Sequence, residues 1–359
     1  MKNKQNKKPI IKVAILLILF LLFTSWHLKI VFLYLIFLSL RQSIPDYKYY
    51  KKIINRSALA VFLLSFVIFF PDRTADKDDY IQSVYIDKKT RDEIGEPIIP
   101  YLTNIIGEGE IMTAVSIGSY FIPDNVFKGS ALGNVINYMQ GTYFFNNNFH
   151  TKYRELENNE DTPPHNVPFQ IMQDMGFYKN INHYYLHIPD VEDIEDCEVI
   201  VYCHGYTGNW VLYSSLFAEY TNAIIIAVET PSFSGYFSGR AMKNIVQDII
   251  PHAYKRIGIP YKKAHIIGLS NGGSAINYAA ANYPKTFQSY TILSASLRSY
   301  PKTNKKVHVI YGSKDYSGGI SSKIPKSKYV RHRIKGEDHS LLVARPKLTF
   351  DLINEIIEK

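Results

Sequence analysis

Residues 264–273 read AHIIGLSNGG, and this stretch decides the fold class. The apolar run 264–267 is typical of a buried strand, and the Ala-rich residues 274–283 are typical of a helix. Between them lies Gly268-Leu269-Ser270-Asn271-Gly272, a G-x-S-x-G sequence, which by itself is also compatible with an ordinary glycine-rich turn. Flanking glycines remove the Cβ clashes that would block a tight strand-to-helix turn. Its place between strand and helix therefore predicts that Ser270 is a nucleophile, beside a helix N-terminus that favours developing negative charge.

The residues from 181 onward alternate between short β-type runs and helical stretches. Such alternation predicts an α/β fold, with a largely parallel sheet covered by helices on both faces. Helices are expected at 240–257, 274–283 and 347–358. Strands are expected at His183–Ile188, Glu198–Tyr202, Ala223–Val228, His265–Ile267, Ser289–Leu293, Val307–Tyr311 and Tyr329–Ile334.

Four further motifs follow predicted strands in chain order. They are Cys203-His204-Gly205-Tyr206-Thr207-Gly208, Glu229-Thr230-Pro231-Ser232-Phe233-Ser234-Gly235, Gly312-Ser313-Lys314-Asp315 and Gly336-Glu337-Asp338-His339. Together with the serine motif they resemble the α/β-hydrolase family over residues 181–359, in the order Ser, Asp, His that this fold uses. The match at 229–235 is loose, because serines replace the usual glycines of that turn.

This resemblance implies roles for individual residues. His339 would remove the proton of Ser270 and later protonate the leaving group, while Asp315 would hold the imidazole in the needed tautomer. The backbone N–H groups of Tyr206 and Asn271 would form the oxyanion hole. His204 corresponds to a histidine that is normally structural in the family, so we do not expect it to be the catalytic base.

No cofactor or metal is implied by the sequence, which has no Walker loop, no Cys/His zinc spacing and no dinucleotide fingerprint. Cys197 and Cys203 are expected to be buried small side chains rather than a disulfide. The net charge is +9 over the 359 residues, but residues 1–57 contain eleven Lys or Arg and one acidic residue. The remainder is nearly neutral, so the charge does not indicate a nucleic-acid partner.

The basic N-terminal region is also strongly apolar, which predicts a membrane region at 1–71 with about three transmembrane segments at 9–26, 29–41 and 57–71. Its basic stretches, 1–8 and 41–56, favour the cytoplasmic side and would leave the rest of the chain outside. The third apolar run is short enough to lie along the membrane interface instead, and the rest of the chain would then stay on the cytoplasmic side.

The segment 72–180 is expected to consist of helices and loops, either as a cap over a pocket or as packing between the membrane region and the domain at 181–359. The chain as a whole is thus predicted to be a membrane-anchored serine hydrolase that cleaves small-molecule or lipid esters through an acyl-enzyme, with the lipid bilayer as its partner. A non-catalytic hydrolase-like binding or scaffold protein, and a peptidase or acyltransferase with the same triad, are the alternatives.

Overall fold

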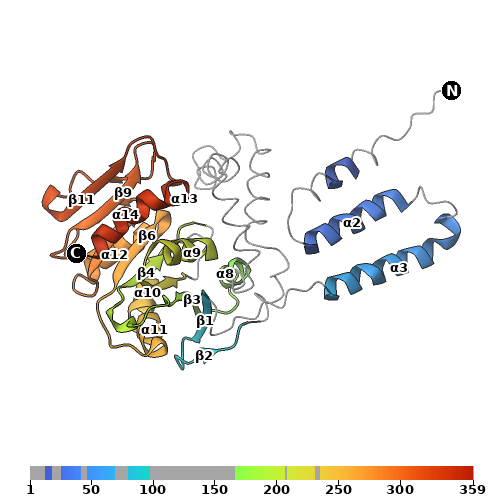
Figure 1. The fold of residues 1–359 in the computed structure, drawn as a ribbon, viewed down its shortest axis with the longest axis horizontal. Helices are drawn as coiled ribbons and strands as arrows, with labels where there is room; N and C mark the ends of the chain where they lie inside the picture. The colour runs from blue at the N-terminus through green and yellow to red at the C-terminus, as the bar shows by residue number, and fades with distance from the viewer. Residues whose placement is uncertain are drawn as a thin grey trace. The chain divides into compact units, whose positions relative to one another are not determined.

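The computed structural model describes residues 13–17, 26–41, 47–68, 80–97, 166–206, 208–230 and 235–358 (Figure 1). These residues fall into two compact units, one that holds the N-terminal helices and one that holds a large sheet. Each unit is described by itself.

The N-terminal unit contains two packed helices, α2 (Trp26–Leu40) and α3 (Tyr47–Ile68). The rings of Tyr34 and Phe62 stack at 4.6 Å, and Arg41 donates a hydrogen bond to Asn55 at 3.5 Å, so the helices run antiparallel. In the part of the chain that the structure describes, no helix is both long enough and apolar enough to span a bilayer.

The three predicted transmembrane segments agree with the observed helices to different extents. The segment predicted at 29–41 lies almost entirely in α2, whereas only residues 13–17 of the segment predicted at 9–26 are described, and they are helical. Residues 57–68 of the segment predicted at 57–71 are the second half of α3, and the last three lie outside the described residues. The helix begins ten residues before the predicted segment, inside the basic stretch expected to be a connection. Neither Gly nor Pro occurs within Tyr47–Ile68, so nothing in that stretch stops the helix.

The described residues of the second unit form a nine-stranded sheet in the order β11-β9-β7-β6-β4-β5-β3-β1-β2. The six strands from β11 to β5 are parallel, whereas β3, β1 and β2 each pair antiparallel with their neighbours. The strands are β1 (Gln82–Asp87), β2 (Glu93–Ile94), β3 (Ile181–His187), β4 (Val199–Cys203), β5 (Ile224–Val228), β6 (His265–Leu269), β7 (Ser289–Leu293), β9 (Val307–Gly312) and β11 (Tyr329–Ile334). A separate two-residue pairing joins β8 (Ser296–Leu297) to β10 (Gly319–Ile320).

Helices cover the sheet on both faces, as predicted. The side of β4, β5 and β6 that carries Val201, Ile226 and Ile266 packs with α10 (Gly239–Asn244), α11 (Ile250–Ile257) and α12 (Gly273–Asn282) in one buried core. A π-helical turn, Ile245–Ile249, joins α10 to α11. On the other side of β4, Tyr202 packs against Phe217 of α9 (Val211–Tyr220), and Phe217 packs against Phe350 of α14 (Pro346–Ile357). The short helices α8 (Val167–Asp174) and α13 (Leu341–Ala344) complete the described helices of this unit.

The chain changes direction at the centre of the sheet, because β5 lies on one side of β4 and β6 lies on the other. In open α/β sheets the crevice beyond the carboxyl ends of two such strands is the usual position of a ligand site. The loop that begins at His204 follows β4 and Ser270 follows β6, so both motifs lie at this crevice.

The prediction that residues 72–180 consist of helices and loops is wrong where β1 and β2 form. All six residues of β1 pair with β3, so these two strands extend the sheet. Val84, Tyr85 and Ile86 are all fully buried, and an apolar run of three residues among polar neighbours is too short to predict a strand. The sheet therefore begins well before residue 181. The expected cap falls mostly on residues 98–165, which lie outside the described residues.

Candidate active site

Ser270 lies on a strained turn between β6 and α12. Its φ is +53°, in the left-handed region that side chains other than glycine rarely adopt. The neighbouring glycines make room for this turn: a Cβ on Gly268 would lie 2.3 Å from the carbonyl oxygen of Gly272, and one on Gly272 would lie 2.2 Å from that of Cys203. The sequence pattern thus produces the predicted strand–turn–helix geometry, which raises the serine hydroxyl above the end of the sheet.

The structure brings Ser270, His339 and Asp315 together from the ends of β6, β11 and β9. The Oγ of Ser270 lies 2.8 Å from Nε2 of His339, and both carboxylate oxygens of Asp315 lie 3.1 Å from Nδ1 of the same ring. A carboxylate only accepts hydrogen bonds, so Nδ1 carries the proton and Nε2 is left to accept from the serine. The arrangement can therefore remove the Ser270 proton without any change of tautomer.

Asp315 is held as an anion by its surroundings. Its side chain is only 2% exposed, and burial opposes ionisation, but hydrogen bonds from His339 and Ser317 outweigh that cost and lower the pKa of the carboxyl. The Ser317 backbone N–H donates to Oδ1 at 2.8 Å. An ionised carboxylate at this position can stabilise a positive charge on the imidazole.

Asp338, the other acidic residue near His339 that could pair with it, is engaged elsewhere. Its Oδ1 accepts hydrogen bonds from the backbone N–H and the hydroxyl of Ser340, the residue that precedes α13. Glu337, one position earlier, pairs with Arg345 at 3.0 Å. Of the acidic residues around the histidine, it is therefore Asp315 whose carboxylate faces Nδ1.

Ser317 is a member of this cluster that the sequence analysis missed. Its hydroxyl lies 2.7 Å from Oδ1 of Asp315, 2.8 Å from the carbonyl oxygen of Ser294 and 2.8 Å from Nδ1 of His339. The only signal in the sequence is a serine two residues after the predicted acid, which reads as an ordinary turn residue.

The two residues expected to supply the oxyanion hole flank the nucleophile. Asn271 directly follows Ser270 in the turn. Tyr206 directly follows Gly205, and a Cβ on Gly205 would lie 3.2 Å from Cβ of Ser270, so this loop runs against the nucleophile with no room for a larger side chain. Both residues are therefore next to the nucleophile, and a stabilising role of their N–H groups for a negatively charged oxygen stays a prediction.

His204 is fully buried, and burial lowers its pKa to about 4, although a hydrogen bond to Gly205 partly offsets the effect. Its hydrogen bonds are with Gly205, Thr230 and Gln170, whereas the hydroxyl of Ser270 bonds to His339. These contacts agree with a structural role rather than with that of the base. Cys197 and Cys203 are both buried and free, as expected.

The strand order, the antiparallel β3 and the turn at Ser270 define the described residues from 80 onward as an α/β-hydrolase fold. This agrees with the resemblance seen in the sequence. No protein-family model and no curated protein matches the chain.

Several solved structures resemble about half of the chain. The S-formylglutathione hydrolase from Agrobacterium tumefaciens is 13% identical over 52% of this chain and 92% of its own, with a TM-score of 0.38. Est1E from Butyrivibrio proteoclasticus is 16% identical over 50% of this chain and 96% of its own, with a TM-score of 0.37. An acetyl xylan esterase from Aspergillus awamori is 16% identical over 44% of this chain and 89% of its own, with a TM-score of 0.35. The fold assignment rests on the strand order and the turn, not on these scores.

Proposed function

We propose that this chain is a membrane-anchored serine hydrolase that cleaves carboxylic esters through an acyl-enzyme. The observation that carries the proposal is the hydrogen-bonded series from Ser270 through His339 to Asp315, with 2.8 Å between the serine oxygen and Nε2. A nucleophile, a base within hydrogen-bond reach and a group that orients the base are the parts that acyl transfer requires.

In the first half of the reaction, Nε2 of His339 takes the Ser270 proton while Oγ attacks the ester carbonyl carbon. The carbonyl oxygen becomes negatively charged and is stabilised by the N–H groups of Tyr206 and Asn271. When the intermediate collapses, the C–O bond to the alcohol breaks and the imidazolium gives its proton to the leaving oxygen. Water then attacks the acyl-serine by the same steps, which releases the acid and restores Ser270.

Asp315 acts throughout by orienting the ring and stabilising its charged form. Its lowered pKa keeps the carboxyl ionised at neutral pH, so it accepts from Nδ1–H in both protonation states of the imidazole. The preference for ester substrates rests on the likeness of the His204–Gly208 loop to that of small carboxylesterases. The same triad could also transfer the acyl group to another acceptor or cleave an amide.

Membrane attachment is proposed from the apolar runs within residues 9–71 and their basic flanks. The described part of this region is helical, and α2 consists almost entirely of apolar residues. Release of the full-length protein from isolated membranes by detergent, but not by high salt or alkaline carbonate, is the expected behaviour of an integral segment. Extraction by carbonate alone would contradict it.

The activity is tested with a fluorophosphonate probe and with p-nitrophenyl acetate on the full chain in detergent. We expect the wild-type protein to be labelled and to hydrolyse the ester, and the Ser270→Ala variant to do neither while keeping its thermal unfolding transition. The matched control is Ser274→Ala, four residues further along the chain, whose hydroxyl bonds the backbone N–H of Phe237 and not His339. Labelling that survives in Ser270→Ala would contradict the assignment of the nucleophile, and a folded wild type that is neither labelled nor active would favour the non-catalytic alternative.

A further inference from the structure

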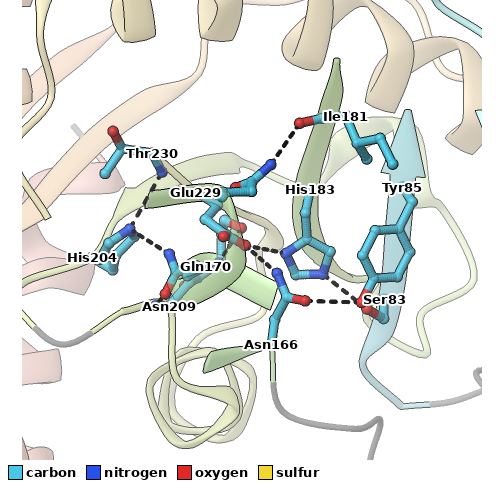
Figure 2. Close-up of polar contacts among 12 residues, drawn as sticks. Ser83, Tyr85, Asn166, Gln170, Ile181, His183, His204, Asn209, Glu229 and Thr230 are labelled. Carbon is cyan, nitrogen blue, oxygen red and sulfur yellow. Dashed lines mark hydrogen bonds and ion pairs between the residues drawn. The ribbon is translucent and has the colours of Figure 1, made fainter. Parts of the chain in front are cut away.

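A buried network of polar side chains lies beneath the loop that follows β4 (Figure 2). It joins α8, β1 and β3 to the residues that follow β4 and β5. Its members are Ser83, Tyr85, Asn166, Gln170, His183, His204, Asn209, Glu229 and Thr230, all of them buried except Ser83, which is partly buried. The triad uses none of these residues.

Gln170 of α8 bridges the two ends of the loop 204–209. Its Nε2 lies 3.2 Å from Nε2 of His204, and its Oε1 accepts a hydrogen bond from the backbone N–H of Asn209 at 3.1 Å. The side chain is fully buried. Because a buried amide with both ends bonded has little freedom to move, this contact restrains the loop from below.

His204 transmits this restraint to the peptide that is expected to bind the oxyanion. Its Nδ1 lies 2.7 Å from the carbonyl oxygen of Gly205, and a carbonyl only accepts, so Nδ1 carries the proton. Nε2 is then the acceptor for the backbone N–H of Thr230 at 3.3 Å and for Gln170. The Gly205 carbonyl belongs to the same peptide plane as the N–H of Tyr206, so the His204 ring sets the direction in which that N–H points.

The remainder of the network holds α8 in place. Asn166, which directly precedes α8, donates to Glu229 and accepts from Tyr85 at 2.9 Å. Glu229 lies 2.6 Å from Nδ1 of His183, whose Nε2 lies 2.8 Å from the Ser83 hydroxyl. Burial raises the pKa of Glu229 and lowers that of His183, so burial disfavours the charged form of both side chains.

We propose that Gln170 is a positioning residue of the oxyanion hole, which acts through His204 and Asn209 on the Gly205–Tyr206 peptide. The inference rests on the proposed hydrolase function. It assigns a catalytic purpose to α8, a helix outside the segment that resembles the hydrolase family.

The chain offers a matched control in Gln173, one turn further along α8. Gln173 is also buried, but its Nε2 donates to the carbonyl oxygens of Ile181 and Tyr178 rather than to His204. The test compares Gln170→Met with Gln173→Met in the full chain, using p-nitrophenyl acetate and thermal unfolding. Removal of one oxyanion donor outright costs about 10²–10³ in kcat, so misplacement of one is expected to cost about 10-fold.

We expect Gln170→Met to lower kcat about 10-fold with KM within 2-fold of wild type, and Gln173→Met to leave kcat within 2-fold. Equal losses of kcat in the two variants, or an unchanged kcat in Gln170→Met, would overturn the inference. A wild-type protein with no Ser270-dependent activity would instead contradict the proposed function, so the two failures are distinguishable.

Gln170→Glu provides a second variant of the same size, which tests the inference even when the methionine variant does not fold. A neutral carboxyl can donate to Nε2 of His204 and accept from Asn209, whereas an ionised one cannot donate. The titratable groups facing it are His204 and Glu229, with His183 and Lys88 beyond Glu229. The ratio of its kcat to that of wild type at the same pH is expected to fall as the pH rises, and a ratio that does not change with pH would overturn the inference.

Discussion

The hydroxyl oxygen of Ser317 lies 2.8 Å from Nδ1 of His339, closer than either carboxylate oxygen of Asp315 at 3.1 Å. The Nδ1–H therefore faces a hydroxyl and a carboxylate together. The same hydroxyl has two possible acceptors for its single proton, the carbonyl oxygen of Ser294 and Oδ1 of Asp315. Ser317 thus fixes the relative position of the acid and the histidine.

Replacement of Ser317 by Ala is expected to lower kcat about 10-fold with little change in KM. The loss corresponds to one hydrogen bond to a charged group, about 1.5 kcal/mol, removed from a ring that gains charge in the transition state. Steady-state kinetics with p-nitrophenyl acetate measure it. Ser321→Ala is the control, because the Ser321 hydroxyl accepts only a long bond, 3.4 Å, from the backbone of Lys323. A kcat for Ser317→Ala equal to that of the control would show that the hydroxyl has no part in orienting the ring.

Asp315→Asn should lose far more activity than Asp338→Asn. The Asn side chain can present its amide N–H₂ to Nδ1 and so favour the wrong tautomer, a change that costs about 10⁴-fold in kcat in other Ser–His–Asp triads. Asp338 bonds to Ser340 instead, so its amide should affect the turn before α13 and leave kcat within about 3-fold. The initial rate of ester hydrolysis at saturating substrate separates the two, and a larger loss in Asp338→Asn would reverse the assignment of the acid.

Acid should weaken the folded protein through His204. The unfolded chain binds a proton on this ring below pH 6.5, whereas the buried ring does not bind one until about pH 4, so the free energy of unfolding decreases as the pH falls through this interval. The contribution is about 3 kcal/mol at most. A His204→Gln variant has no imidazole at this position to titrate. The difference between the free energies of unfolding of wild type and variant, measured in urea, should therefore become smaller as the pH falls from 6.5 to 4. A difference that stays constant over this range would mean that the ring is protonated in the folded state.

Reporter fusions after residue 75 are expected to place the hydrolase domain outside the cytoplasm. The basic stretches 1–8 and 41–56 favour the inside, which requires one further crossing before residue 72. The stretch Asp72–Asp79 has four aspartates against Arg73 and Lys77, so it offers little resistance to export. Two fusions at this position, one to a reporter that is active only outside the cytoplasm and one to a reporter that is active only inside it, measure the side on which the domain lies. Signal from the cytoplasmic reporter alone would mean that the third apolar run does not cross.

Much of the fold was predictable because its signals are local. The apolar runs of β4, β5 and β6 are buried on both faces, and such strands read as continuous hydrophobic segments. Ser270, Asp315 and His339 each follow one of the predicted strands, and the ordered fold brings the ends of parallel strands to one edge. The three residues that the structure brings together and the glycines around the turn could therefore be predicted from the sequence.

The features that the sequence did not reveal depend on partners far along the chain. Ser83 meets His183 across 100 residues and Asn166 meets Glu229 across 63, and no local pattern marks such pairs. Gln170 is one of two glutamines in a helix of only eight residues, and nothing in that short sequence distinguishes it from Gln173. Helix α9 was also missed, because its first seven residues, Val211–Phe217, are all buried and show no alternation between apolar and polar faces.

The pairing of β1 with β3 has a consequence for the order of folding. Val84 and Tyr184 are 100 residues apart, whereas β4, β5 and β6 follow one another with short helical connections. Closing a long loop costs chain entropy before any contact repays it, so we expect the parallel centre of the sheet to form first and β1 to dock late. The polar network under the loop 204–209 needs Ser83 and Tyr85 from that strand. A newly made chain should therefore bury most of its core before its active site is complete.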